Sequence, residues 1–159
     1  MESIISDTNK KKELLTRGKR ELLIKEKREL LISKQILKEL NLIKGIKNIQ
    51  IISPITKYEK GINEIFNCDY PILFDIDIKN VNLIDLIEGL HLENENFIVL
   101  PFFKCKSWFK LEIDDIFIFL ENMYKNKYFY SLTLCLIKSK RILDIELGET
   151  TYEIRIKQL

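Results

Sequence analysis

The order of hydrophobic and polar residues divides the chain into two parts. Residues 1–45 are dominated by an eight-residue repeat of two basic residues, one glutamate and two leucines, which begins at Lys11, Lys19 and Lys27. Nearly all of these residues favour the α-helix. Residues 46–159 instead mix strand-like alternation with helical spacing. The pattern therefore predicts a helical basic arm over residues 1–45 and an α+β globular domain over residues 46–159.

The arm is expected to be one long helix from about residue 8 to residue 43. Asp7 or Thr8 can accept hydrogen bonds from the first free N–H groups, and Gly45 suits the end of a helix. A glycine inside a helix weakens it, so an interruption near Gly18 is the alternative.

The period of the repeat limits how this helix can pack. Each residue advances about 100° around a helix, so eight residues overshoot two turns by about 80°. The leucine pairs therefore move around the axis instead of forming the single seam that a two-stranded coiled coil requires. The helix is expected to lie over a globular body or to meet apolar surfaces on several sides. A recent gene duplication without mechanical meaning is the alternative.

From residue 71 onward, the globular part is expected to follow roughly the order β-α-β-α-β-β-β. Residues 71–79 alternate between apolar and charged side chains, as in a half-buried strand, and Asn80 caps a helix over residues 81–90. Residues 128–138 are apolar on both faces and are predicted to form a central strand. The remaining predicted strands are 46–53, 97–103, 141–147 and 151–157, and the remaining helices are 58–66 and 113–124, the second led into by residues 107–111.

These elements predict a fold of the α+β class. The long basic helix precedes a mixed or mainly antiparallel sheet of about five strands with helices on one face. Gly148 and Glu149 are expected to form the turn of a hairpin between the last two strands.

Composition and charge place the chain among globular proteins of the cell interior. Hydrophobic residues make up 46% and charged residues 31%, enough apolar surface to offset the entropy of ordering. Three unpaired cysteines and the lack of a signal sequence predict a cytoplasmic protein. Residues 1–47 hold 13 Lys and Arg and 7 Asp and Glu, whereas the remainder holds 13 and 17. Positive and negative charge are thus separated along the sequence. This asymmetry indicates which kinds of partner the protein can attract and says nothing about its fold.

Catalytic chemistry finds little support in the sequence. His91 is the only histidine, and no cysteine or histidine spacing suits zinc. No catalytic residue, metal site or cofactor is therefore predicted. One alternative is a metal-dependent nuclease, because Asp75, Asp77 and Lys79 share a strand face where two carboxylates can hold a divalent ion. An ordinary solvated strand face is the simpler interpretation.

The leading hypothesis is a non-enzymatic protein-binding module that inhibits or regulates a partner. An acidic strand face and a surplus of aromatic and apolar side chains suit a basic protein surface. The residues assigned to this contact are Asp75, Asp77, Trp108, Phe109, Ile118 and Phe119.

The basic arm offers an alternative function, the binding of nucleic acid. Its residues for phosphate contacts are Lys11, Lys12, Arg17, Lys19, Arg20, Lys27 and Arg28. Interleaved glutamates, with expected pairs of Glu13 with Arg17 and Glu21 with Lys25, reduce the charge that is free to bind. The arm is also a candidate for pairing with a second copy of the chain, and no membrane contact is expected because the longest apolar run is too short to span a bilayer.

The layout of residues 95–159 resembles that of bacterial toxin-immunity proteins. The segments that carry the resemblance are the helix after SWFKL, then YFYSLTLCLI, then RILDIELGETTYEIRI. The resemblance implies a small cytosolic α+β inhibitor with an acidic, aromatic-edged face. It includes no diagnostic motif, so it assigns no functional residue.

Overall fold

The computed structural model describes residues 2–67, 70–77, 88–92, 94–102, 106–125, 131–147 and 150–159. Its elements in chain order are α1 (Glu2–Leu40), β1 (Ile46–Ile52), α2 (Thr56–Asn67), β2 (Phe74–Asp77), β3 (Phe97–Leu100), β4 (Trp108–Ile113), α4 (Ile116–Lys125), β5 (Ser131–Leu136), β6 (Arg141–Leu147) and β7 (Thr151–Gln158). Most of the helix expected over residues 81–90, with its cap Asn80, lies outside the described residues. Lys79 and the turn at Gly148 and Glu149 also lie outside them.

Within the described residues, the strands form one seven-stranded sheet in the order β1-β4-β3-β5-β6-β7-β2. Every neighbouring pair is antiparallel. β5 lies at the centre, as its apolar character on both faces predicts, and β6 pairs with β7 along its length. The α+β class and the long N-terminal helix are confirmed, with seven strands where about five were expected.

Helices cover both faces of the sheet, which corrects the expectation that they cover one. On β5, Leu134 packs in a cluster with the last turns of α1 and with α4, whereas the adjacent Cys135 packs in a cluster with α2. Successive side chains of a strand point to opposite faces, so α1 and α4 cover one face and α2 covers the other. We call these the first face and the second face. The inner strands are apolar on both sides, and both sides must be covered.

α2 comes very close to the second face at Gly61. A Cβ atom at this position would lie 2.6 Å from Cδ1 of Ile142 and 2.8 Å from Cδ2 of Leu159. One turn earlier, the hydroxyl of the buried Tyr58 donates a hydrogen bond to the carbonyl of Leu136 (3.1 Å). The glycine that weakens the helical pattern in the sequence is therefore the residue that lets this helix reach the sheet.

β4 was not predicted. Residues 108–113 form a strand between β1 and β3, so Ile113 belongs to a strand and not to the predicted helix. The helix begins afterwards, where Oδ1 of Asp115 accepts hydrogen bonds from the N–H groups of Phe117 (2.8 Å) and Ile118 (3.3 Å). This is the geometry of an N-cap. The carboxylate of Asp115 thus sets where the helix starts.

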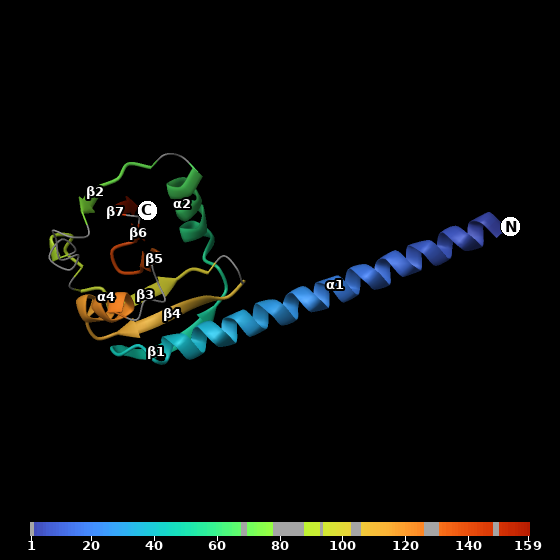
Figure 1. Cartoon of the computed structure of the whole chain (residues 1–159), viewed down its shortest axis with the longest axis horizontal. Helices are drawn as coiled ribbons and strands as arrows, with labels where there is room; N and C mark the ends of the chain where they lie inside the picture. The colour runs from blue at the N-terminus through green and yellow to red at the C-terminus, as the bar shows by residue number, and fades with distance from the viewer. Residues whose placement is uncertain are drawn as a thin grey trace.

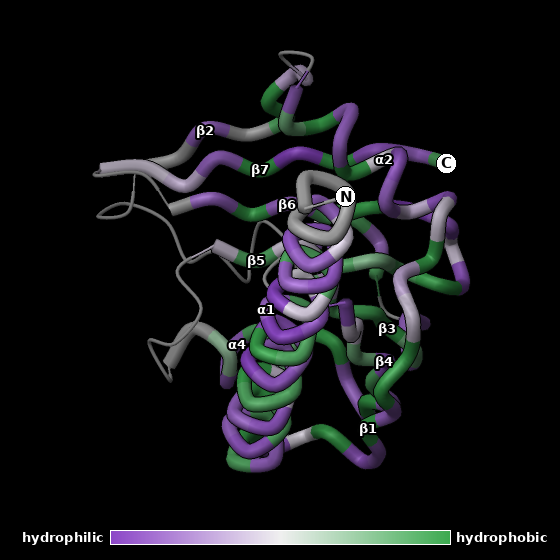
Figure 2. The backbone as a smooth tube through the Cα atoms, turned by 90° about the vertical axis from the view of Figure 1, so that its right-hand side faces the viewer, coloured by the Kyte–Doolittle hydropathy of each residue, from purple (hydrophilic) through white to green (hydrophobic). Residues whose placement is uncertain are grey.

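α1 is continuous from Glu2 to Leu40 and starts earlier than the predicted cap at Asp7 or Thr8. Gly18 does not interrupt it, and Gly45 follows its end with a φ of 93°, a conformation that suits glycine. Only its last turns pack on the first face, and the rest projects away from the sheet (Figure 1). Figure 2 shows hydrophobic and hydrophilic residues alternating along the helix.

Candidate functional site

Most of α1 stands clear of the rest of the molecule. Residues 7–31, which we call the rod, are exposed along their length except for the half-buried Glu29. A protein helix owes most of its stability to a packed apolar face, and the rod has no such packing within the described chain. Packing on the globular part therefore does not explain why the helix continues over residues 7–31.

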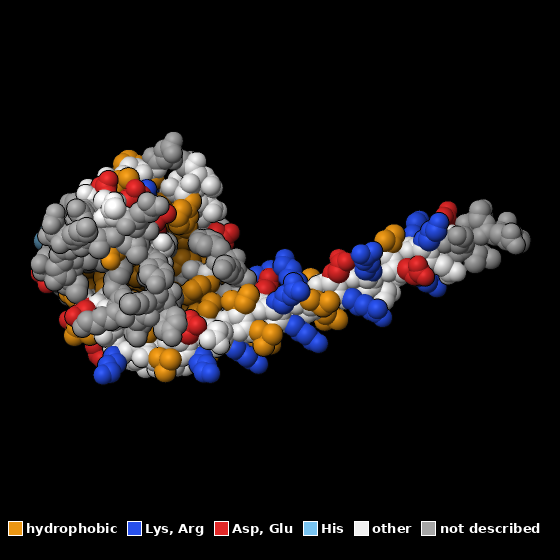
Figure 3. Space-filling model, viewed as in Figure 1, with side chains coloured by type: hydrophobic (Ala, Val, Ile, Leu, Met, Phe, Trp, Pro, Cys, Tyr) orange, Lys and Arg blue, Asp and Glu red, His pale blue; other side chains and the backbone are white. Residues whose placement is uncertain are grey.

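Large apolar side chains are spread along the rod. Each of them is between 51% and 68% exposed, and Figure 3 shows them alternating with Lys and Arg side chains. Burying one such side chain against a partner is worth roughly 1.5–3 kcal/mol. The set consists of Leu14, Leu15, Leu22, Leu23, Ile24, Leu30 and Leu31.

The rod is also basic, with nine Lys and Arg against five Asp and Glu. Its one ion pair within the described residues joins Nε of Arg17 to Oε1 of Glu21 (3.3 Å). The expected pairs of Glu13 with Arg17 and of Glu21 with Lys25 do not form. The glutamates of the rod thus neutralise less of its positive charge than the sequence suggests. Most of its basic side chains are available to a partner.

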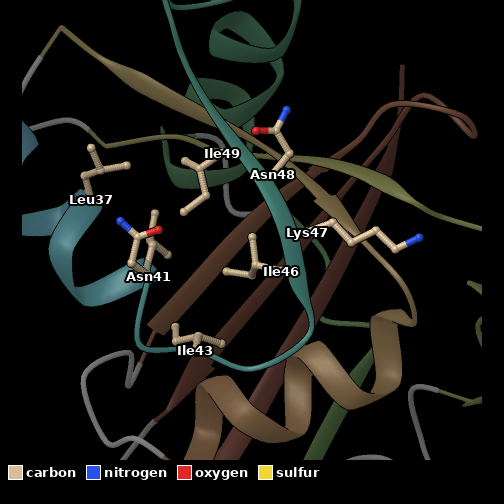
Figure 4. Close-up of a pocket in the computed structure, with 8 residues that line it drawn as sticks. Leu37, Asn41, Ile43, Ile46, Lys47, Asn48 and Ile49 are labelled. Atoms are coloured by element: carbon tan, nitrogen blue, oxygen red, sulfur yellow. The ribbon is translucent and has the colours of Figure 1, made fainter.

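The base of the rod is fixed to the body by a small apolar contact. Ile36 and Leu40 are buried in the cluster of the first face. Beside them, a cavity of about 310 Å³ lies between the end of α1 and the edge strand β1. Figure 4 shows Leu37 and Asn41 across this hollow from Ile49 and Ile46. The lining mixes apolar side chains with Asn41, Lys47 and Asn48, and it includes no catalytic pair.

The second face carries polar side chains beyond the end that α2 covers. Cross-strand pairs of β6 and β7 form three rows there. Counted outward from α2 the rows are Ile142–Lys157, Asp144–Arg155 and Glu146–Glu153. Asp75 of β2 pairs with Glu153 and so extends the outer row. We call Asp75, Asp144, Glu146 and Glu153 the acidic face.

Arg155 is the centre of this face. Its Nη2 donates to Oε2 of Glu153 (2.8 Å), and its Nη1 lies 3.3 Å from Oε2 of Glu146 and 3.6 Å from Oδ2 of Asp144. One guanidinium thus faces three carboxylates, and Asp75 adds a fourth negative charge in the outer row. Like charges directly opposite on neighbouring strands are destabilising. The acidic face therefore keeps an excess of negative charge.

Asp144 is the most buried carboxylate of the acidic face, with 4% of its side chain exposed. Its Oδ1 accepts a hydrogen bond from the hydroxyl of Thr133 (2.9 Å). Its Oδ2 has no hydrogen-bond partner in the described part of the chain. Burial raises the pKa of Asp144, although Thr133 and Arg155 act in the opposite direction.

Groups suited to catalysis do not come together within the described residues. No group of three or more His, Cys, Asp or Glu side chains there is placed to hold a metal ion. His91 is exposed, and its carbonyl accepts a hydrogen bond from Arg141 (3.2 Å). Cys135 is buried, which raises the pKa of its thiol to about 12. A thiol in this state is a poor nucleophile.

The residues predicted for protein binding fall into two groups. Trp108, Phe109 and Phe119 are at most 2% exposed, so they form the core and offer no surface to a partner. They are buried because β4 is a strand inside the sheet and because Phe119 faces the core from α4. Ile118 is 51% exposed and Asp75 is exposed. The side chain of Asp77 lies outside the described part of the structure.

The basic residues predicted for nucleic-acid binding are all exposed on the rod. Arg155 and its carboxylates were not assigned to any site, although the alternation of β6 and β7 placed them on facing strands. The sequence does not show that β2 pairs with β7, and this pairing is what brings Asp75 beside Glu153.

Within the described residues, no helix combines the length and apolar character needed to cross a membrane. No family model matches the chain, and neither a curated protein nor a solved structure matches it.

Proposed function

We propose that this protein is a non-enzymatic protein-binding module and that the rod is its docking element. The observation that carries the proposal is the set of seven exposed leucine and isoleucine side chains on the rod, which packs on no other part of the described chain. An apolar surface of this kind is typical of a site that another protein covers. The partner fits best if it offers apolar grooves together with acidic side chains.

The spiral arrangement of the leucine pairs bears on the kind of partner. Successive pairs lie about 80° apart around the axis, so no single flat surface touches all of them. A partner that wraps the helix, or several surfaces at once, can cover them. Inhibition or regulation of that partner, as in immunity proteins, antitoxins or phage inhibitors, is the proposed consequence. The cytoplasm, where a buried thiol such as Cys135 stays reduced, is the proposed location.

Nucleic-acid binding is the second candidate, favoured by the basic side chains of the rod that make no ion pair. A phosphate backbone would engage Lys11, Lys12 and Arg20, but it has no use for the leucines beside them. Such binding weakens steeply with salt, whereas binding through leucines does not.

The test is affinity capture with the tagged full-length chain from its native host, with and without nuclease and at low and high salt. Wild type is compared with the triple variant Leu15→Gln, Leu22→Gln and Leu30→Gln, and with Ile51→Gln as a control for an exposed apolar residue outside the rod. We expect a stoichiometric protein with wild type and with the control, and its loss with the triple variant. Equal capture by all three would overturn the rod as docking element. Binding that disappears with nuclease and salt would favour nucleic acid.

A further inference from the structure

We propose that the acidic face of one copy of this chain binds the rod of a second copy, so that the protein assembles head to tail. The proposal rests on the proposed function, because it names the partner of the rod. Its basis is the complementarity of two surfaces of the same molecule, one basic and apolar, the other acidic with apolar side chains at its border.

One side of the rod combines basic and apolar residues at helical spacing. Lys12, Leu15, Lys19, Leu23 and Leu30 follow each other at intervals of three, four, four and seven residues. Residues at such intervals share one side of a helix. The two lysines are seven residues apart, which is about 10.5 Å along the axis. We call this set the docking side of the rod.

The acidic face offers a matching row. Asp75, Glu153 and Glu146 are direct cross-strand neighbours on β2, β7 and β6. Neighbouring strands lie about 4.8 Å apart, so the outer carboxylates of this row are about 9.6 Å apart. Lys12 and Lys19 can therefore meet Asp75 and Glu146 at the same time when the rod lies across the strands.

Apolar side chains are also present beside the row. Leu73, two residues before Asp75, is 52% exposed although its N–H group is bound to the carbonyl of Ile154 (2.8 Å). Ile72 next to it is exposed as well. These side chains can cover leucines of the docking side while the carboxylates take the lysines.

The charge of the acidic face is unbalanced within its own chain. Arg155 is shared by three carboxylates, and the buried Asp144 keeps one oxygen without a hydrogen-bond partner in the described residues. A further cation beside the row would relieve the repulsion between Glu146 and Glu153 and between Glu153 and Asp75. Lysine ammonium groups supply that cation, whereas the described carboxylates are not placed to hold a metal ion.

The rod cannot reach the acidic face of its own chain. α1 is one unbroken helix, and it leads away from the sheet from its base onward (Figure 1). The contact is therefore between molecules. The two contacting surfaces differ, so it repeats from copy to copy and gives open chains or closed rings.

Complementation between two variants tests this arrangement, with the mass measured by light scattering on nucleic-acid-free protein at low salt. One variant carries Lys12→Gln and Lys19→Gln on the docking side. The other carries Asp75→Asn and Glu146→Gln on the acidic face. We expect wild type to grow beyond a dimer with concentration and each variant to associate roughly tenfold more weakly or worse. Their mixture should form a 1:1 dimer and nothing larger.

The control is Lys10→Gln with Lys25→Gln. These two lysines lie at least about 120° around the helix from Lys12 and Lys19. The control should assemble like wild type, and equal loss in it would overturn the proposal. Undiminished assembly of the acidic-face variant would mean that rods pair with each other. Undiminished assembly of the docking-side variant would overturn head-to-tail assembly through Lys12 and Lys19, whereas the proposed function, which rests on the leucines, would still be tested by the leucine variant. A wild type that stays monomeric would overturn head-to-tail assembly alone and leave the rod free for a different protein.

Discussion

Two single residues decide how closely the layers of this protein pack and how its charge is distributed. Gly61 lets α2 approach the sheet, since a Cβ atom would come within 2.6 Å of Ile142. Asp144 holds a carboxylate where burial disfavours charge. The two residues affect stability through different physical causes, and each can be tested by one substitution.

Replacing Gly61 by alanine should lower the free energy of unfolding by about 1 kcal/mol. Overpacking a core costs about 1–3 kcal/mol, and this exceeds the roughly 1 kcal/mol that alanine gains over glycine in a helix. Urea denaturation of the full chain measures the difference. Gly18→Ala is the control, because nothing lies within 4 Å of the added methyl group there. An unchanged or higher stability of Gly61→Ala would show that Ile142 and Leu159 move aside freely.

Asp144 should make stability fall as pH rises. Its folded pKa is raised, with burial as the main cause, so the folded state binds more protons than the unfolded state above about pH 4. The contribution of Asp144 is therefore greatest below its unfolded pKa and decreases as pH rises through its folded pKa. The substitution Asp144→Asn removes this pH-dependent contribution to stability. The unfolding free energy of wild type minus that of Asp144→Asn should decrease as pH rises above about 4. An increase would mean that the ion pair with Arg155 outweighs burial.

At the scale of the elements, α1 combines an anchored end and a free end. Its last turns belong to the core of the first face, and its preceding residues make the rod. The same residue type, leucine, therefore serves two purposes along one helix. Leu37 and Leu40 hold the helix to the sheet, and the leucines between residues 14 and 31 are exposed to solvent.

Leu40→Ala and Leu23→Ala should differ strongly in their effect on the isolated chain. Leu40 is fully buried, so its truncation should lower the free energy of unfolding by about 2–5 kcal/mol. Leu23 is exposed, so its truncation should change that free energy by no more than about 0.5 kcal/mol. Chemical denaturation at low concentration, below self-association, measures both. A large effect of Leu23→Ala would mean that the rod packs on the body.

The elements also show which features the sequence predicts and which it does not. The bounds of β6 agree with the alternation of residues 141–147, and the central place of β5 agrees with its apolar faces. β4 was missed because its six residues run with little separation into the helical spacing of α4. Helices on both faces were missed because one apolar face of a strand looks like the other until the covering helix is known.

For the whole molecule, the charge asymmetry of the sequence becomes a separation in space. The basic rod extends to one side of the molecule (Figure 3), and the acidic face belongs to strands β2, β6 and β7 of the sheet. The acidic face could be predicted in part, since the carboxylates of β6 and β7 alternate along their strands. Its fourth member depends on β2 pairing with β7 across more than seventy residues of sequence. Such a contact between distant segments leaves no local pattern.

The free rod also affects how the protein moves through water. Its 25 residues extend about 38 Å at the rise of an α-helix, and this length adds friction without adding much mass. A single molecule therefore diffuses and sediments more slowly than a sphere of equal mass, and it leaves a sizing column early. Its elution volume alone resembles that of a larger assembly, and only an absolute measurement of mass separates an elongated monomer from a dimer.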